Sequence, residues 1–446
     1  MARLFGTDGV RGVANIDLTP DLLVRIGSAA AAFFGTSLSR KPSILCGIDP
    51  RISSGMLEAA LAAGICAGGG NVTRLGVVTT PAIAYLVKDL GADAGAMISA
   101  SHNPYEYNGV KFFSRDGYKL GDESEQRLEA LIRSTEKPAY VTGANIGAIE
   151  TDLEAHDSYV DHLVRSAARS FRGVRMVIDC ANGASSMISP RTFRRLGAEV
   201  YVINNQPNGL NINVDCGSTH PAQLQKAVLE HNAHIGLAHD GDADRLIVVD
   251  ETGKVLDGDY IMAICGLHML RKGELHENTV VATVMSNLGL DIAMRKAGGR
   301  VVKAAVGDKY VLEMMRREGH NLGGEQSGHL IFSDFSTTGD GILTGIQLIN
   351  VMKETNSPLS RLARQMQRLP QVLLNVQVER IERYHANPRI ALAIDDAEDE
   401  LLGRGRVLVR ASGTEPLVRV MVEAEDEEQA QSVANKLAEA IRKELA

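Results

Sequence analysis

Three carboxylates stand at alternate positions in the segment Asp240-Gly-Asp242-Ala-Asp244, and Arg245 follows them directly. Carboxylates this close together repel one another unless a cation lies between them. Hard divalent ions such as Mg²⁺ take oxygen ligands of this kind, and three carboxylates around Mg²⁺ leave a local charge of about −1 that an arginine can offset. The segment therefore predicts a magnesium site, with a solvated acidic turn as the alternative.

A calcium-binding loop between two helices is a second kind of metal site to consider, because Glu251 stands at the twelfth position counted from Asp240. Such a loop requires glycine at its sixth position, where this sequence has Arg245. The apolar run 246–249 also predicts a strand rather than a helix. These two departures favour magnesium.

A candidate nucleophile lies in the segment Ser99-Ala-Ser101-His102-Asn103-Pro104. An Asn-Pro turn beside a strand end would hold the hydroxyl of Ser101 in a fixed and accessible position. Serine is a weak nucleophile until a base and cations assist it, and Lys111 is a cation close enough in sequence to return across the turn. An ordinary serine on a surface turn is the alternative reading of these residues.

Two further loops carry polar groups between glycines. Glu325, Gln326 and Ser327 stand between Gly324 and Gly328, and their side chains can bond sugar hydroxyls or an amine, although a polar turn without a ligand is equally compatible. The segment 410–416 (RASGTEP) places a glycine-containing turn and two hydroxyls between Arg410 and Arg419. Turn amides and guanidinium groups can hold a phosphate dianion, so this loop predicts an anion site or, alternatively, a hairpin with surface arginines.

The elements that must position these loops alternate between short apolar runs and amphipathic stretches. Such alternation predicts parallel or mixed sheets with helices on both faces, and ligands gather at the carboxyl ends of the strands in sheets of this kind. Thr19 and Pro20 are expected to cap and open the first helix. We expect strands at 43–48, 72–75, 175–180, 199–203, 279–283 and 300–304, and helices at 20–34, 56–67 and 190–196.

Three segments share a glycine-bearing apolar stretch that leads into a polar loop, namely 94–101, 234–240 and 321–325. They indicate either an internal repeat of α/β units or three unrelated strand–loop junctions. The chain after residue 369 differs, with strands expected at 372–378, 406–410 and 418–423 and a helix capped by Asp426 and Gln429. We therefore expect domains at 1–153, 154–254, 255–369 and 370–446, with a linker within 134–152.

Composition excludes several classes of function. The chain of 446 residues has a net charge of −8, no Trp, 10 Tyr and 9 Phe, which argues against nucleic acid as a partner. It lacks an apolar run long enough to cross a membrane, and its first residues do not form an apolar signal core. The five cysteines contain no CxxC pair and are expected to be reduced thiols, which predicts a cytoplasmic location.

Taken together, the motifs SASHNP with NGVK downstream, DGDADR, GEQSGH and RASGTEP occur in an order that matches one family. The sequence resembles the α-D-phosphohexomutases over essentially its whole length. The resemblance implies three related α/β domains with mixed or parallel sheets and a smaller C-terminal α+β domain that binds phosphate, arranged around a central cleft.

The resemblance also implies roles for individual residues. Ser101 is expected to carry the phosphoryl group as phosphoserine, and its phosphate would hold Mg²⁺ together with Asp240, Asp242 and Asp244. Lys111, Arg245 and His102 would assist phosphoryl transfer, with Lys111 as a possible proton carrier. The residues expected to bind substrate are Thr7, Arg11, Glu325, Ser327, His329, Arg410, Ser412, Gly413, Thr414 and Arg419.

Within the family, the opening FGTDGVRG, the segments 211–221 and 306–310, and Gln326 favour the branch that acts on glucosamine phosphates. The expected reaction interconverts glucosamine 6-phosphate and glucosamine 1-phosphate through a 1,6-bisphosphate, as a step toward UDP-N-acetylglucosamine and cell-wall synthesis. Glucosamine or glucose 1,6-bisphosphate is the expected intermediate or activator, a homodimer is possible, and phosphorylation of Ser101 is expected to activate the enzyme.

Three alternatives remain at this point. A phosphomannomutase or phosphoglucomutase of the same family would share all four motifs. A phosphatase that uses Asp240 as its nucleophile is disfavoured because Asp244 stands where such a motif has Thr or Val. A phosphosugar sensor without catalysis would need neither the nucleophile nor the aspartate trio.

Overall fold

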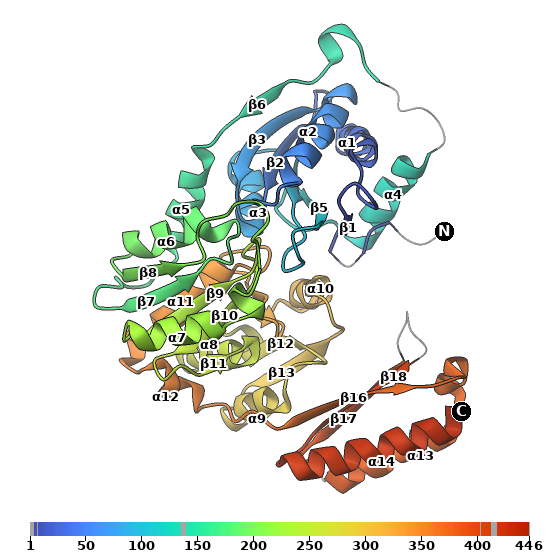
Figure 1. The fold of residues 1–446 in the computed structure, drawn as a ribbon. Coiled ribbons are helices and arrows are strands. Elements are labelled where there is room, and N and C mark those ends of the chain that lie inside the picture. Colours follow the sequence, from blue (N-terminus) through green and yellow to red (C-terminus); the bar gives the residue numbers. More distant parts are fainter. Residues whose placement is uncertain (1–3, 7, 135–139, 402, 412–416, 446) are drawn as a thin grey trace. The chain divides into compact units, whose positions relative to one another are not determined.

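The computed structural model describes residues 4–6, 8–134, 140–401, 403–411 and 417–445. The chain forms two compact units (Figure 1). The larger unit comprises Met1–Met285 and Gly299–Gln365, and the smaller unit comprises Ser286–Gly298 and Met366–Ala446. The described residues form three sheets in the larger unit and one sheet in the smaller unit.

The first sheet has the strand order β1-β5-β4-β2-β3-β6. Strands β2, β3, β4 and β6 are parallel, whereas β5 runs antiparallel to β4 and to β1. Its strands are β1 (Val10–Val13), β2 (Ser43–Ile48), β3 (Asn71–Val77), β4 (Ala94–Ile98), β5 (Tyr107–Ser114) and β6 (Ile149–Thr151). The accompanying helices are α1 (Pro20–Gly35), α2 (Ser54–Ala67), α3 (Thr80–Asp89) and α4 (Asp122–Arg133).

Helices cover both faces of this sheet, as the sequence predicted. Ala94 and Ala96 of β4 belong to a buried cluster with apolar residues of α1 and α2. Gly95 lies between them and faces α3, because a Cβ atom on Gly95 would lie 2.5 Å from a methyl group of Val87. The alternation of a strand therefore places α1 and α2 on one face and lets α3 pack closely on the other.

The second and third sheets have the orders β11-β10-β9-β7-β8 and β13-β12-β14-β15. The second sheet contains β7 (Arg175–Asp179), β8 (Glu199–Ile203), β9 (Ile235–His239), β10 (Leu246–Asp250) and β11 (Val255–Leu256), with α5 (Ala155–Arg165), α6 (Ser185–Arg195) and α7 (Ala222–Glu230). The third contains β12 (Thr279–Thr283), β13 (Arg300–Ala304), β14 (Leu322–Gly324) and β15 (Leu330–Phe332), with α8 (Gly258–Lys272), α10 (Asp308–Glu318), α11 (Gly341–Thr355) and α12 (Leu359–Ala363).

The three sheets of the larger unit repeat one topology. In each, a strand pairs in parallel with an earlier strand and antiparallel with the strand that follows it. These strands are β4, β9 and β14, which are the three glycine-bearing segments that the sequence analysis compared. The predicted internal repeat of α/β units is confirmed, and the loops after β4 and β9 carry Ser101 and the aspartate trio.

The smaller unit is the expected α+β domain, joined by one helix from the middle of the chain, α9 (Leu288–Lys296). Its sheet has the order β16-β18-β17 and is covered on one face by two helices (Figure 1). The elements are β16 (Gln371–Gln377), β17 (Arg406–Ala411), β18 (Leu417–Glu423), α13 (Pro388–Leu401) and α14 (Glu427–Leu445). Asp426 caps α14, since its carboxylate accepts a hydrogen bond from the Gln429 amide at 2.8 Å.

Three details differ from the sequence predictions. The expected linker contains β6, which pairs in parallel with β3. The helix expected from Pro190 begins earlier, at Ser185, so that Pro190 lies inside α6. The second sheet extends beyond residue 254, because β11 pairs with β10.

Two predictions from composition agree with the structure. All five cysteines are described, buried and free of disulfide bonds. Among the described residues, the structure contains no helix with the length and apolarity needed to cross a membrane.

Candidate active site

Ser101 lies in the loop after β4, three residues beyond the end of that strand, and is buried. Its Oγ donates a hydrogen bond of 2.5 Å to Oδ2 of Asp240, which follows β9 in the second sheet. Ser101 has a φ of +51°, a left-handed conformation that is unfavourable for a residue with a Cβ atom and is concentrated at functional sites. The structure thus brings the predicted nucleophile and the first predicted metal ligand together from two sheets.

Asp240, Asp242 and Asp244 form a compact group whose carboxylate oxygens lie within 4.8 Å of one another. Burial, together with the neighbouring charges of Asp244 and Asp242, raises the pKa of Asp240 well above its usual value. Oδ1 of Asp242 and Oδ1 of Asp244 are buried and have no hydrogen-bond partner among the described residues. Crowded carboxylates with unused buried oxygens are the donor set that a hard divalent cation requires.

Asp242 is oriented through its other oxygen, Oδ2. This atom accepts hydrogen bonds from Thr80 Oγ1 at 2.6 Å and from Lys111 Nζ at 2.9 Å. The Thr80 amide also donates to the Asp242 carbonyl at 3.0 Å. The first turn of α3 therefore fixes the position of Asp242 through both its backbone and its side chain.

Lys111 is buried among carboxylates. Its Nζ lies 2.9 Å from Asp242 Oδ2, 3.0 Å from Asp8 Oδ2 and 3.8 Å from Asp244 Oδ2. Burial by itself lowers the pKa of Lys111, but Asp242, Asp8 and Asp244 outweigh burial and raise the pKa. A lysine that keeps its charge suits the electrostatic role predicted for Lys111 better than the predicted role in proton transfer.

A chain of ion pairs continues from Lys111 toward the third sheet. Asp8 accepts a hydrogen bond from Lys119 Nζ at 2.7 Å, and Lys119 also pairs with Asp308 at the start of α10. His329 completes the group. Its Nδ1 lies 3.5 Å from Asp244 Oδ2, and its Nε2 accepts a hydrogen bond from the Gly339 amide at 3.0 Å. The three sheets of the larger unit are thus joined around the aspartate trio by buried and half-buried charges.

Three other predicted residues lie near this group. Nδ1 of His102 is 3.4 Å from Ser101 Oγ, and burial followed by the charges of Arg245 and Arg11 lowers the pKa of His102 to about 4. Arg245 follows Asp244, and its Nε lies 4.0 Å from Asp244 Oδ1. Arg11 in β1 forms an ion pair with Asp8. The structure therefore assembles Ser101, His102, Lys111, the aspartate trio, Arg11, Arg245 and His329.

The predicted sugar loop lies between β14 and β15. Glu325 accepts a hydrogen bond from the Gly307 amide at 3.0 Å, and Ser327 is exposed. Nε2 of Gln326 is buried without a hydrogen-bond partner among the described residues, and leaving such a donor unpaired is costly. These features are compatible with sugar binding, which stays a prediction.

The predicted anion site belongs to the smaller unit and is described there alone. Arg410 and Arg419 are directly opposite each other in the antiparallel pair of β17 and β18. Two like charges at opposed positions of a sheet destabilise it unless an anion lies between them. Thr7, Ser412, Gly413 and Thr414 were also predicted to bind substrate and lie outside the described residues.

The sequence analysis missed several residues that orient the site. Asp8 and Lys119 carry the ion-pair chain, and Thr80 orients Asp242. Thr80 follows β3 and was recognisable in principle, because polar residues just after buried parallel strands lie at the ligand-binding edge. Lys119 follows a turn after β5 and has no such signal in the sequence.

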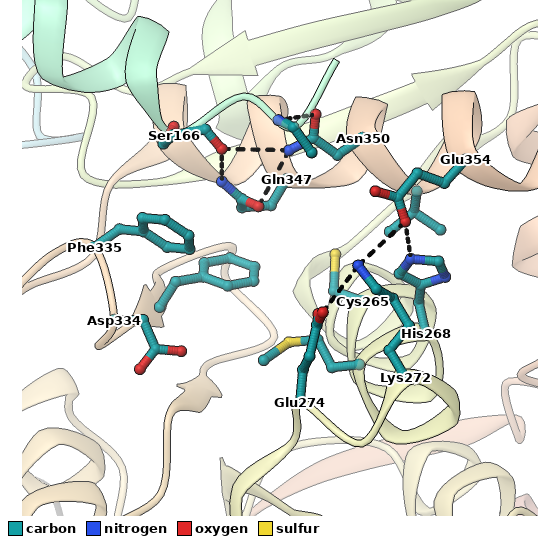
Figure 2. A pocket seen from close by; sticks show the side chains of 14 residues that line it. Ser166, Cys265, His268, Lys272, Glu274, Asp334, Phe335, Gln347, Asn350 and Glu354 are labelled. Carbon is teal, nitrogen blue, oxygen red and sulfur yellow. Dashed lines mark hydrogen bonds and ion pairs between the residues drawn. The ribbon is translucent and has the colours of Figure 1, made fainter.

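A cavity of about 340 Å³ lies elsewhere in the larger unit and is lined by residues of α8, α11 and β15, among others (Figure 2). Two basic side chains that line it, His268 and Lys272, lie 2.8 Å and 3.4 Å from Glu354. Among the described residues, the group of three acidic, His or Cys side chains close enough together to hold a metal ion is Asp240, Asp242 and Asp244, which do not line this cavity. The aspartate trio, and not this cavity, is therefore the candidate active site.

Family models match most of the chain. Four models match consecutive parts of the chain: phosphoglucomutase/phosphomannomutase alpha/beta/alpha domain I at residues 2–139, domain II at 157–253, domain III at 257–369 and the C-terminal domain at 373–440. Among curated proteins, the chain is 55% identical to a phosphoglucosamine mutase of Symbiobacterium thermophilum and 52% identical to one of Acetivibrio thermocellus. Both alignments cover 100% of both chains.

Solved structures share the fold. A phosphoglucomutase/phosphomannomutase family protein from Burkholderia thailandensis superposes with a TM-score of 0.83 at 24% identity, covering 99% of this chain and 98% of that one. An N-acetylphosphoglucosamine mutase from Aspergillus fumigatus, in complex with GlcNAc-6P and magnesium, gives a TM-score of 0.72 at 19% identity, covering 100% and 96%.

Proposed function

The chain belongs to the phosphoglucomutase/phosphomannomutase family, and on this premise we propose that it interconverts glucosamine 6-phosphate and glucosamine 1-phosphate. One observation carries the proposal: Ser101 Oγ lies 2.5 Å from a buried aspartate trio that has unused oxygens. Full-length relatives at 55% and 52% identity that are named phosphoglucosamine mutase support this choice of substrate.

The reaction proceeds through phosphorylated Ser101. The phosphoryl group leaves Ser101 Oγ and bonds to the C1 hydroxyl oxygen of glucosamine 6-phosphate; that hydroxyl loses its proton, and the departing Ser101 Oγ takes up a proton to become a hydroxyl. The resulting 1,6-bisphosphate turns around in the site, and Ser101 Oγ then takes the phosphoryl group from O6. The released product is glucosamine 1-phosphate, and the enzyme is phosphorylated again.

Positioning and charge neutralisation account for most of the catalysis of phosphoryl transfer. Lys111 and Arg245 lie beside the trio and stabilise negative charge on the phosphoryl oxygens. Asp240, Asp242 and Asp244, with a phosphate oxygen on Ser101, are the groups that would hold Mg²⁺. The ion would supply further neutralisation of that charge.

The phosphate that does not react needs a separate binding site that accepts it in both orientations of the sugar. The cross-strand pair of Arg410 and Arg419 is a suitable dianion clamp, because a bound phosphate would relieve the repulsion between the two guanidinium groups. Glu325, Gln326 and Ser327 would bind the amine and hydroxyls of the sugar.

Rates with three substrates test the proposal. We expect kcat/KM for glucosamine 6-phosphate to exceed those for glucose 6-phosphate and mannose 6-phosphate by at least about 10-fold, since a site that pairs with an amine leaves polar groups unpaired when a hydroxyl replaces it. The measurement is a coupled assay of each 1-phosphate, with the enzyme first phosphorylated by the matching 1,6-bisphosphate. A preference for glucose or mannose phosphate would instead identify a different mutase of the same family.

A further inference from the structure

The backbone of the Ser101 loop is held by side chains that the proposed chemistry does not use. The carbonyl oxygen of Ser101 accepts one hydrogen bond from Arg51 Nη2 at 2.9 Å and another from Asn213 Nδ2 at 2.9 Å. The carbonyl oxygen of Asn103 accepts from the same two groups, at 2.9 Å and 3.2 Å. A carbonyl oxygen has two lone pairs, so both acceptors are fully used.

The two donors come from different sheets. Arg51 follows β2 in the first sheet, and its Nε lies 3.1 Å from Asp49 Oδ2, with both side chains buried. Asn213 lies in the loop after β8 in the second sheet, and its backbone N–H donates a hydrogen bond to the Ala181 carbonyl at 2.9 Å. Side chains from the first and the second sheet therefore both hold the backbone of the Ser101 loop.

The metal-binding loop packs against the same atoms. A Cβ atom on Gly241, between Asp240 and Asp242, would lie 2.5 Å from the Ser101 carbonyl oxygen and 3.0 Å from Asn213 Nδ2. Only glycine lets the metal-binding loop approach this closely. The position of Asn213 is thus linked to Ser101 and to the aspartate trio at once.

We infer that Asn213 is a positioning residue for the phosphoryl-transfer step, acting through the Ser101 carbonyl. The φ of Ser101, +51°, is one that a serine adopts only when its surroundings enforce it. The hydrogen bond from Asn213 is the contact through which the second sheet helps to hold this conformation. Ser101 Oγ therefore points toward Asp240 only when the first and second sheets are packed together. The inference rests on the proposed role of Ser101 and gives a function to the segment 211–221, which sequence analysis used only to distinguish a branch of the family.

Asn213→Gly is the sharpest test, because Asn213 itself has a φ of +60° and glycine keeps that backbone conformation without strain. We expect kcat to fall by about 10- to 100-fold, since a displacement of about 1 Å can lower a rate 100-fold. KM for the sugar phosphate should change by less than about threefold, because Asn213 has no place in substrate binding.

Asn204→Gly is the matched control. Asn204 also has a left-handed backbone, with a φ of +50°, and follows β8 in the same sheet, but its side-chain amide lies 3.4 Å from Gln223 rather than near Ser101. Asn213→Asp is a second variant that keeps the size of the side chain and removes the donor, so it should lower kcat as well. Rates are expressed per chain that accepts phosphate on Ser101, so that a smaller fraction of folded protein is not counted as a fall in kcat.

Equal kcat values for Asn213→Gly and Asn204→Gly would overturn the inference. A loss confined to KM would also overturn it, because it would place Asn213 in substrate binding. Turnover that survives Ser101→Ala would instead contradict the proposed function, so the two failures are distinguishable.

Discussion

Ser101→Ala is expected to lower kcat by about 10⁴-fold or more, because removal of a covalent nucleophile removes the route that the other groups assist. The variant should still bind Mg²⁺ and the sugar phosphate. The aspartate trio, Lys111 and the sugar loop keep their own contacts, so Mg²⁺ and glucosamine 6-phosphate should still bind with measurable heat in titration calorimetry. The loss should therefore appear in kcat and not in the ability to form the complex.

Ser170→Ala provides a control for the loss of a serine hydroxyl. Ser170 Oγ donates to the Leu196 carbonyl at 3.3 Å in the second domain, so its removal should leave turnover unchanged. Near-normal turnover of the Ser101 variant would exclude Ser101 as the phosphoryl carrier.

Asp242→Asn should weaken Mg²⁺ binding by about 100-fold or more and reduce turnover in proportion to the loss of bound metal. The substitution keeps the size of the side chain but replaces a carboxylate whose Oδ1 has no other partner among the described residues. It also removes the charge that Lys111 Nζ meets at 2.9 Å. The measurement is Mg²⁺ titration calorimetry on the unphosphorylated protein, with kcat recorded in parallel.

Asp250→Asn is the control for the loss of a buried carboxylate in the same sheet. Asp250 is also buried at the end of a strand, but its Oδ1 accepts hydrogen bonds from Thr252 and Lys254 and it stands outside the trio. This variant should lose some stability and retain its Mg²⁺ affinity. An Asp242 variant that binds Mg²⁺ as tightly as the unaltered protein would show that the trio is not the metal site.

Local patterns in the sequence were sufficient to predict the parts of the site that lie close together along the chain. Asp240, Asp242 and Asp244 are alternate positions of one loop, and Ser101 lies three residues after a buried apolar run. The repeat of the first three domains was visible because β4, β9 and β14 share a glycine-bearing sequence and, as the structure shows, the same partners. Periodicity reports such elements because burial of one face imposes it.

Contacts between distant residues could not be predicted in this way. Lys119 and Asp308 are 189 positions apart, and Asn213 and the Ser101 carbonyl are 112 positions apart. No local pattern records which polar residues meet when three sheets pack together. The predicted start of α6 at Pro190 was wrong for a related reason. Proline favours the first turn of a helix, but here the burial of Ile188 and Phe193 outweighs the cost of a proline inside the helix.

The central claim is that Ser101 carries the phosphoryl group beside the aspartate trio. The most direct test is to incubate the protein with Mg²⁺ and glucosamine 1,6-bisphosphate and to map the bound phosphate by mass spectrometry. We predict one acid-stable phosphoryl group, on Ser101, that passes to the sugar and is replaced by the phosphoryl group of O6 when glucosamine 6-phosphate is added, so that an isotopic label on Ser101 moves into the sugar phosphate. A phosphoryl group on Asp240 that hydroxylamine removes, or a chain that turns over without any bound phosphate, would contradict the claim.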